Sequence, residues 1–313
     1  MTIANFFMPP SPIQRINVPF LIQKNIRLWL KRDDLLHAQV SGNKWRKLKH
    51  NLIAAERQQK NHLLTFGGAH SNHLYATAAA GRLFGFQTTG VVRGEPPTSL
   101  SPTIHFAQSC GMNIEFVSRA QYQKWTQKTD YQALINIFSD KYVIPEGGTN
   151  DWAILGCQEI VTELREQMFD LKKSYLCTSV GTGGTISGII SALGGTGKVV
   201  GFAALKGDFL TQEVSKILRS GGDEVSQNWA INNDFHFGGY AKFQPTLITF
   251  VNNFKKQYGV ALDPVYTGKM MFGIFELLQN NYFLPDSDVI AIHTGGLQGV
   301  EGYNERFPDQ KIQ

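Results

Sequence analysis

Short apolar runs alternate with longer helical patterns along almost the whole 313-residue chain. Residues Asn25–Arg32 alternate apolar and polar side chains as a strand does, whereas Lys44–Gln59 places its apolar residues at helical spacing. Strands that alternate with helices in this way form parallel sheets covered by helices on both faces. The sequence therefore predicts an α/β protein. Its other expected strands are His62–Phe66, Gln87–Val92, Asn113–Val117, Tyr142–Pro145, Ser174–Ser179, Lys198–Ala203 and Asp288–His293.

In such folds ligands bind at the carboxyl ends of strands, where loops lead into helix N-termini.

The chain length suits two domains, because about 150 residues per domain is usual. Hydrophobic residues make up 42% of the chain, which is enough for two cores and excludes a disordered or collagen-like chain. The Pro- and Gly-rich stretch Pro145–Asp151 is the expected boundary.

The net charge of +5 suits an anionic small molecule as well as a nucleic acid. No cluster of Lys and Arg of the nucleic-acid-binding type occurs, so a nucleic-acid partner is disfavoured.

The three cysteines, Cys110, Cys157 and Cys177, form no CxxC pair, which argues against disulfides and cysteine-held metal. Neither a secretory signal nor about 18 consecutive apolar residues are present. We expect a soluble cytoplasmic protein with no membrane partner.

A glycine-rich loop, Val180–Gly188, follows an apolar run and opens a helical pattern. Its backbone N–H groups and the helix N-terminus predict a cradle for a phosphate group. A dinucleotide-binding fingerprint is disfavoured because Ile186 stands where the third glycine should be, and no P-loop lysine is present. A glycine-rich turn without a ligand is the alternative.

A second loop, Phe66–His73, precedes an alanine-rich helix. Ser71 and Asn72 stand where that helix begins, so they either cap the helix or face a ligand. His70 and His73 could share a zinc ion, but no third ligand is evident nearby and we expect no metal.

A third loop, Val40–Leu48, carries Lys44 at the start of a helix. Taken alone, Lys44 is a surface charge, because a catalytic lysine needs burial or an aldehyde partner.

Together these loops and three further motifs resemble the fold-type II pyridoxal-phosphate enzymes, the tryptophan synthase β-like group. Within that group the chain is similar to the family that unites 1-aminocyclopropane-1-carboxylate deaminase with D-cysteine desulfhydrase. The resemblance extends from about Pro12 to Gly302. Its motifs are KRDD…SGNKWRKL, FGGAHSNH, IPEGGTN, GTGGT, DPVYTGKMM and HTGG, in the order and spacing of that family.

This resemblance implies two α/β domains, a small one at 44–145 and a large one formed by 1–43 and 146–313. It implies pyridoxal 5'-phosphate as cofactor, bound covalently by Lys44, with Asn72 bonded to the cofactor's 3'-oxygen. By family analogy the protein is a homodimer. The phosphate would be held by Gly181, Thr182, Gly183, Gly184 and Thr185.

The resemblance also assigns the substrate side. Ser71, Asn72 and His73 would receive the carboxylate of a small amino acid at the helix start. Tyr240 and Tyr266 would line the substrate side of the cofactor ring. The implied catalytic residues are Lys44, Ser71, Tyr240 and Tyr266, with Thr267 supporting Tyr266 or the ring edge.

Two positions separate the branches of this family. The deaminases carry Glu and Leu where this chain has Thr267 and Thr294, whereas the desulfhydrases carry small hydroxyl residues there. A carboxylate beside the pyridine nitrogen keeps it protonated and makes the ring a strong electron sink. A hydroxyl at Thr294 stabilises a neutral nitrogen, which suffices when a good leaving group stands on Cβ.

The sequence thus favours β-elimination of D-cysteine, or a related small D-amino acid, to pyruvate, ammonia and sulfide. One alternative is deamination of 1-aminocyclopropane-1-carboxylate or another small amino acid. A second alternative, from another class, is a non-catalytic protein that binds pyridoxal phosphate or a phosphorylated metabolite.

Overall fold

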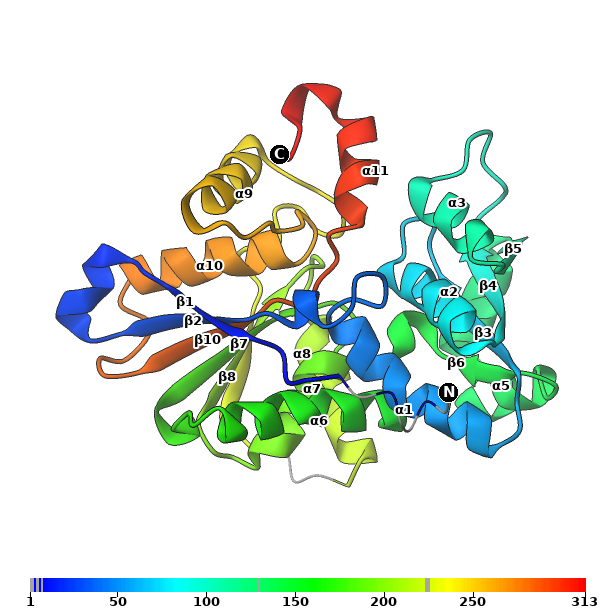
Figure 1. Cartoon of the computed structure of the whole chain (residues 1–313), viewed down its shortest axis with the longest axis horizontal. Helices are drawn as coiled ribbons and strands as arrows, with labels where there is room; N and C mark the ends of the chain where they lie inside the picture. Colours follow the sequence, from blue (N-terminus) through cyan, green and yellow to red (C-terminus); the bar gives the residue numbers. More distant parts are fainter. Residues whose placement is uncertain (1–2, 4–5, 7, 129, 223–225) are drawn as a thin grey trace.

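The computed structural model describes residues 3, 6, 8–128, 130–222 and 226–313 (Figure 1). Its strands form a six-stranded sheet of order β1-β2-β10-β7-β8-β9 and a four-stranded sheet of order β5-β4-β3-β6. The strands are β1 (Ile13–Ile16), β2 (Arg27–Lys31), β3 (His62–Gly67), β4 (Gln87–Arg93), β5 (Asn113–Val117), β6 (Tyr142–Ile144), β7 (Ser174–Val180), β8 (Lys198–Ala203), β9 (Trp229–Asn232) and β10 (Asp288–Ile292).

Eleven α-helices connect or cover these strands in the described ranges, and Figure 1 shows them distributed around both sheets. They are α1 (Asn43–Arg57), α2 (Asn72–Phe84), α3 (Pro102–Ser109), α4 (Arg119–Gln123), α5 (Tyr131–Ile137), α6 (Asp151–Glu166), α7 (Gly184–Leu193), α8 (Phe209–Ser220), α9 (Pro245–Tyr258), α10 (Thr267–Gln279) and α11 (Gly299–Arg306).

The predicted α/β class with parallel sheets is confirmed. Strands pair in parallel in both sheets, except that β1 pairs with β2 in antiparallel fashion. The apolar-run analysis did not find β1 and β9. Both are four-residue edge strands with partly exposed side chains, so neither has a continuous apolar run.

Strand β10 shows why the central strands read as apolar runs. Val289 and Ala291 pack on one face, in the core that includes α9 and α10. Ile290 and Ile292 pack on the other face, in the core that includes α6, α7 and α8. Because successive side chains of a strand point to opposite faces, a strand covered on both sides is mostly apolar, and a buried polar residue such as Asp288 has hydrogen-bond partners.

The four-stranded sheet spans His62–Ile144 and lies inside the predicted small-domain range of 44–145. Helix α1 begins this range and packs against α6, which lies outside it. The division into two domains stays a prediction.

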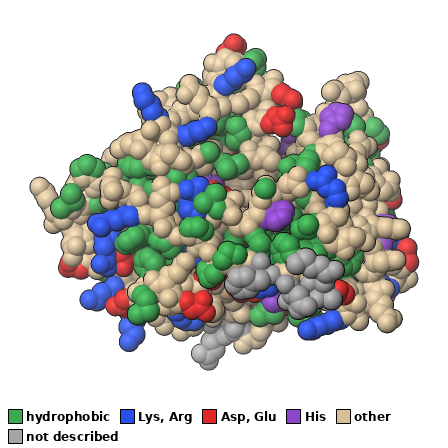
Figure 2. All heavy atoms as spheres, in the orientation of Figure 1, with side chains coloured by type: hydrophobic (Ala, Val, Ile, Leu, Met, Phe, Trp, Pro, Cys, Tyr) green, Lys and Arg blue, Asp and Glu red, His purple; other side chains and the backbone are tan. Residues whose placement is uncertain are grey.

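Two surface findings bear on partners. Figure 2 shows Lys and Arg side chains scattered over the visible face among acidic and neutral ones, with no single basic patch there. Among the described residues, no helix has both the length and the apolar character that crossing a membrane requires.

Candidate active site

The start of α1 is pressed against the loop that follows β10. Gly42 has φ +64°, and a Cβ atom there would lie 2.0 Å from the carbonyl oxygen of Thr294. The N–H of Asn43 donates to that same oxygen at 3.3 Å. Only glycine permits this approach, which fixes the next residue, Lys44, beside the carboxyl end of the central strand.

Lys44 lines a small cavity together with Asn72 and Thr294. Burial, followed by the nearby charge of Lys47, lowers the pKa of Lys44 well below its usual value. Both effects disfavour the ammonium form and leave a neutral amine that can attack an aldehyde or take up a proton. Thr294 adds a hydroxyl, with its Oγ1 3.2 Å from Ser179 Oγ.

Lys47 lies at the glycine-rich loop, one helical turn beyond Asn43. Its Nζ donates to the carbonyl oxygen of Gly147 at 3.0 Å and to Thr149 Oγ1 at 3.1 Å, and lies 3.4 Å from Thr182 Oγ1. A Cβ atom on Gly184 would lie 3.1 Å from this Nζ. A buried lysine therefore stands directly beside the loop that was predicted to hold a phosphate.

The glycine-rich loop itself leaves donors free for an anion. Helix α7 follows Gly183, which has φ +84°, and no side chain in the described structure caps its first turn. The free N–H groups of a helix start carry a partial positive charge that favours an anion. Asn43 Nδ2 donates to Thr185 Oγ1 at 2.9 Å and so ties this loop to the start of α1. This cradle fits the phosphate of the implied cofactor.

The three residues at the start of α2 have different surroundings. Ser71 caps the helix, because its Oγ accepts from the N–H groups of His73 at 3.2 Å and Leu74 at 3.3 Å. Asn72 lines the Lys44 cavity and also a second, neighbouring cavity. Ser71 keeps its hydroxyl proton free to donate, so capping does not exclude the predicted role in substrate binding.

His73 lies behind the cavities rather than in their lining. It is 1% exposed, its Nε2 is 2.8 Å from Thr65 Oγ1, and a Cβ atom on Gly148 would lie 2.7 Å from its ring. Burial, followed by the charges of Lys44 and Lys47, lowers the pKa of His73 well below its usual value. The structure shows this imidazole packed against Gly148, and the predicted contact with a substrate carboxylate stays a prediction.

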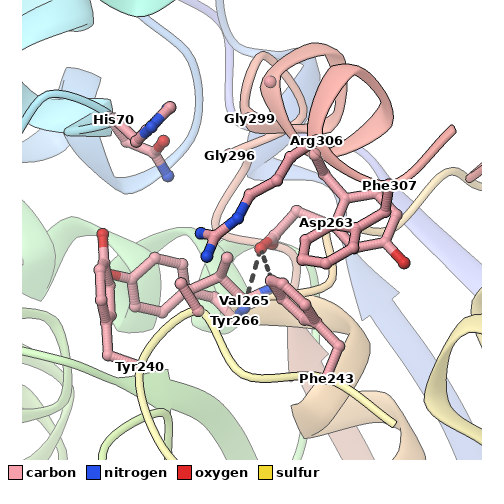
Figure 3. Close-up of a pocket in the computed structure, with 14 residues that line it drawn as sticks. His70, Tyr240, Phe243, Asp263, Val265, Tyr266, Gly296, Gly299, Arg306 and Phe307 are labelled. Atoms are coloured by element: carbon pink, nitrogen blue, oxygen red, sulfur yellow. Dashed lines mark hydrogen bonds between the residues drawn. The ribbon is translucent and has the colours of Figure 1, made fainter. Parts of the chain in front are cut away.

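The second cavity brings the two predicted tyrosines together (Figure 3). The rings of Tyr240 and Tyr266 meet edge to face with centroids 6.2 Å apart. A Cβ atom on Gly181 would lie 3.2 Å from the Tyr266 ring, so this tyrosine also adjoins the glycine-rich loop. Burial raises the pKa of both hydroxyls, which keeps them protonated and able to donate.

Thr267 lies outside both cavities and holds Asp263 in place. It is fully buried, and its Oγ1 and N–H donate to Asp263 Oδ2 at 2.8 and 2.9 Å. Asp263 Oδ1 accepts from the N–H groups of Val265 and Tyr266, both at 2.8 Å. Asp263 lines the second cavity, and the sequence analysis did not single it out. Burial raises the pKa of Asp263, and the four hydrogen bonds oppose this effect. The pKa of Asp263 is raised in total.

Lys269 is a further residue that the sequence analysis missed. Its Nζ donates to the carbonyl oxygens of His236 at 2.9 Å and Gly239 at 2.7 Å, the residues that precede Tyr240. Burial lowers the pKa of Lys269 to about 8. The position three residues after Tyr266 on α10 is the sequence signal that could have pointed to it.

Among the described residues, no cluster of three or more His, Cys, Asp or Glu side chains could hold a metal ion.

A lysine of lowered pKa in a polar cavity, and a glycine-rich phosphate cradle that Asn43 ties to the same helix start, fit pyridoxal phosphate. A family model described as pyridoxal-phosphate dependent enzyme matches residues 8–295. The chain belongs to this family, its cofactor is pyridoxal phosphate, and the predicted resemblance is confirmed.

Within the family, the relatives carry two activities in their names. The Arabidopsis thaliana protein named bifunctional D-cysteine desulfhydrase/1-aminocyclopropane-1-carboxylate deaminase, mitochondrial, is 32% identical over 93% of this chain and 77% of its own length. The putative 1-aminocyclopropane-1-carboxylate deaminase of Thermotoga maritima is 30% identical over 96% of this chain and 98% of its own length.

Solved structures agree with this placement. The structure of an ACC deaminase homologue has a TM-score of 0.82 at 25% identity and covers 98% of this chain and 97% of its own. A fungal L-serine ammonia-lyase from Rhizomucor miehei shares the fold, with a TM-score of 0.63 at 14% identity over 96% of this chain and 99% of its own. The chain is a fold-type II pyridoxal-phosphate enzyme.

Replacing Lys47 by Met should weaken binding of pyridoxal phosphate about 10- to 100-fold, the effect of losing one charge-assisted hydrogen bond. Binding of pyridoxal, which lacks the phosphate, should change much less. Titration of the apoprotein with both compounds measures this difference. Lys49→Met, on the same helix but paired with Glu159, is the matched control. Equal losses for both compounds would show that Lys47 does not contact the phosphate.

Proposed function

We propose that this enzyme catalyses β-elimination of D-cysteine, or a related small D-amino acid, to pyruvate, ammonia and sulfide. The observation that supports it is the lining of the Lys44 cavity, to which the described residues contribute the Thr294 hydroxyl and no carboxylate. A hydroxyl stabilises a neutral pyridine nitrogen, and the resulting weaker electron sink is sufficient when a thiolate can leave from Cβ.

The cofactor, when bound at Lys44, supplies the electron sink for the negative charge that forms at the substrate Cα. Lys44, whose pKa burial lowers, would take the proton from the substrate Cα. The start of α2, with Ser71 and Asn72, binds the substrate carboxylate. Tyr240 and Tyr266, whose hydroxyls both have a raised pKa, orient the substrate and give a proton to the departing sulfur.

The test is an absorption spectrum of the purified protein before and after addition of D-cysteine, with pyruvate and sulfide assayed together. We expect the visible band of the bound cofactor to change while pyruvate and sulfide accumulate in equal amounts. A protein that keeps its cofactor band but releases no pyruvate from D-cysteine would overturn the proposal.

The second candidate is deamination of 1-aminocyclopropane-1-carboxylate, which the names of both relatives favour. Ammonia release from that compound, without pyruvate from D-cysteine, would select it. A coloured protein that turns over neither compound nor any other small amino acid would instead be a non-catalytic binder of pyridoxal phosphate.

We also propose that the protein is a cytoplasmic homodimer with a small domain at 44–145. The four-stranded sheet inside this range supports the domain division. Sedimentation of the holoenzyme at several concentrations tests the dimer.

A further inference from the structure

The cavity beside Tyr240 and Tyr266 continues beyond these tyrosines to α11. Three aromatic rings form its wall there, with Phe243 and Phe307 both packed on Tyr303 at centroid distances of 4.9 and 5.1 Å. These rings have no function in the reaction as proposed so far, because the thiol of D-cysteine is too short to extend past the tyrosines. The extra space beyond the tyrosines would accept a longer substituent on the substrate sulfur.

Arg306, the last residue of α11, extends into this cavity with its guanidinium group on the side of Tyr240 and Asp263 (Figure 3). Its Cζ lies 5.2 Å from the centroid of the Phe307 ring. Within the described part of the chain, the structure shows no carboxylate paired with Arg306. Asp263 lines the same cavity, but its two oxygens already accept four hydrogen bonds.

Close packing sets the position of α11, the helix that carries Arg306. A Cβ atom on Gly302 would lie 3.3 Å from His70 Nδ1, so α11 rests closely on the loop before α2. Arg306 lies one turn further along the same helix face. Burial, followed by the charge of Arg306, lowers the pKa of His70. Arg306 is exposed, and a guanidinium that stands over the Phe307 ring with no carboxylate partner among the described residues can bind an anion.

This anion is not the substrate carboxylate in the proposed reaction. In that reaction the carboxylate lies at the start of α2, where Asn72 lines both cavities, beside Lys44, and Arg306 lines only the second cavity. Arg306 instead meets whatever substituent extends from Cβ past the two tyrosines.

Building on the proposed β-elimination, we propose that the preferred substrates are S-substituted D-cysteines whose sulfur carries a short apolar chain ending in an anion. Lys44 takes the Cα proton, the Cβ–S bond breaks with its electron pair going to sulfur, and a tyrosine hydroxyl protonates that sulfur. Water then releases ammonia and pyruvate. The balance is R–S–CH2–CH(NH3+)–COO− plus H2O giving R–SH, pyruvate and ammonium, with no oxidant or reductant.

The test compares S-(2-carboxyethyl)-D-cysteine with S-(2-carbamoylethyl)-D-cysteine, which has nearly the same shape but no side-chain charge. Calorimetry with the holoenzyme measures the affinity for each compound, and pyruvate release measures turnover. We expect at least a tenfold preference for the carboxylate in affinity and in kcat/KM. Arg306→Met should remove this preference and Arg306→Lys should restore part of it, whereas Arg219→Met, an exposed arginine on α8, should keep it.

Equal affinity for the two compounds, or the same preference in wild type and Arg306→Met, would overturn the anion site. These outcomes are separable from failure of the β-elimination. A protein that prefers the carboxylate in binding but releases pyruvate from neither compound nor D-cysteine would keep the anion site and reject the reaction. Pyruvate from D-cysteine without any preference would do the reverse.

Discussion

Lys44→Ala should lower the turnover of D-cysteine by about 10³-fold or more, because loss of a positioned general base alone costs about 10²–10⁴-fold. On the proposed assignment, the variant also loses the amine that would bind the cofactor covalently. Lys44 lines the cavity with Asn72 and Thr294, and its lowered pKa provides the neutral amine that both roles require. Steady-state kcat measures the first effect, and the visible absorption band of the bound cofactor measures the second.

Lys49→Ala on the same helix is the control, since Lys49 pairs with Glu159 on α6 and lines neither cavity. It should retain the absorption band and nearly all activity. If Lys44→Ala kept the band and more than about a tenth of the turnover, well short of the loss of at least 10²-fold expected for a general base, another residue would have to bind the cofactor.

The central part of the fold was predictable because it is buried on both faces. Strands such as β7, whose seven residues are all buried, must consist of apolar or internally satisfied residues, and this leaves a visible run in the sequence. The edge strands β1 and β9 face solvent in part and leave no such run. Their formation depends on pairing with β2 and β8, which is tertiary information that a local pattern does not contain.

The site was predictable where its chemistry depends on local backbone. A glycine-rich loop before a helix and a serine at a helix start have the same meaning in any fold. The roles of Lys47 and Lys269 were not predictable in this way, because their acceptors are carbonyl oxygens far along the chain, such as those of Gly147 and Gly239. Thr267 donates to Asp263, four residues before it, and lines neither cavity, so its predicted support of Tyr266 or the ring edge stays a prediction.

A buried ionic network links α1 to the rest of the molecule. Arg46 is 1% exposed and donates through Nε and Nη2 to both oxygens of Asp33, each at 2.7 Å. Its Nη1 donates to Glu163 Oε1 at 2.8 Å. Ser11 Oγ donates to Asp33 Oδ1 at 2.6 Å. This network joins the loop after β2 and helix α6 to the helix that carries Lys44, so it fixes the position of that helix.

Arg46→Met should lower the free energy of unfolding at neutral pH by about 3–5 kcal/mol, because it leaves Asp33 buried without its cation. Burial raises the pKa of Asp33, but the charge and hydrogen bonds of Arg46 outweigh this effect and hold the pKa below its usual value. Denaturation with urea measures the loss. Arg57→Met, an exposed position on the same helix, should change stability by no more than about 0.5 kcal/mol.

The pH dependence of this loss identifies its cause. In the wild type, a carboxyl group with a lowered pKa stabilises the fold above its unfolded-state pKa, and this contribution disappears as the pH falls through the folded-state value. In Arg46→Met, Asp33 keeps the burial that raises its pKa and takes up a proton as the pH falls. The difference in unfolding free energy between the two proteins should therefore shrink toward acidic pH.

Adding Asp33→Asn to Arg46→Met should recover part of the stability at neutral pH, since no buried charge then lacks its partner. A deficit that stays constant with pH, or a double variant less stable than Arg46→Met, would mean that lost packing around Arg46 and not the unpaired carboxylate causes the effect.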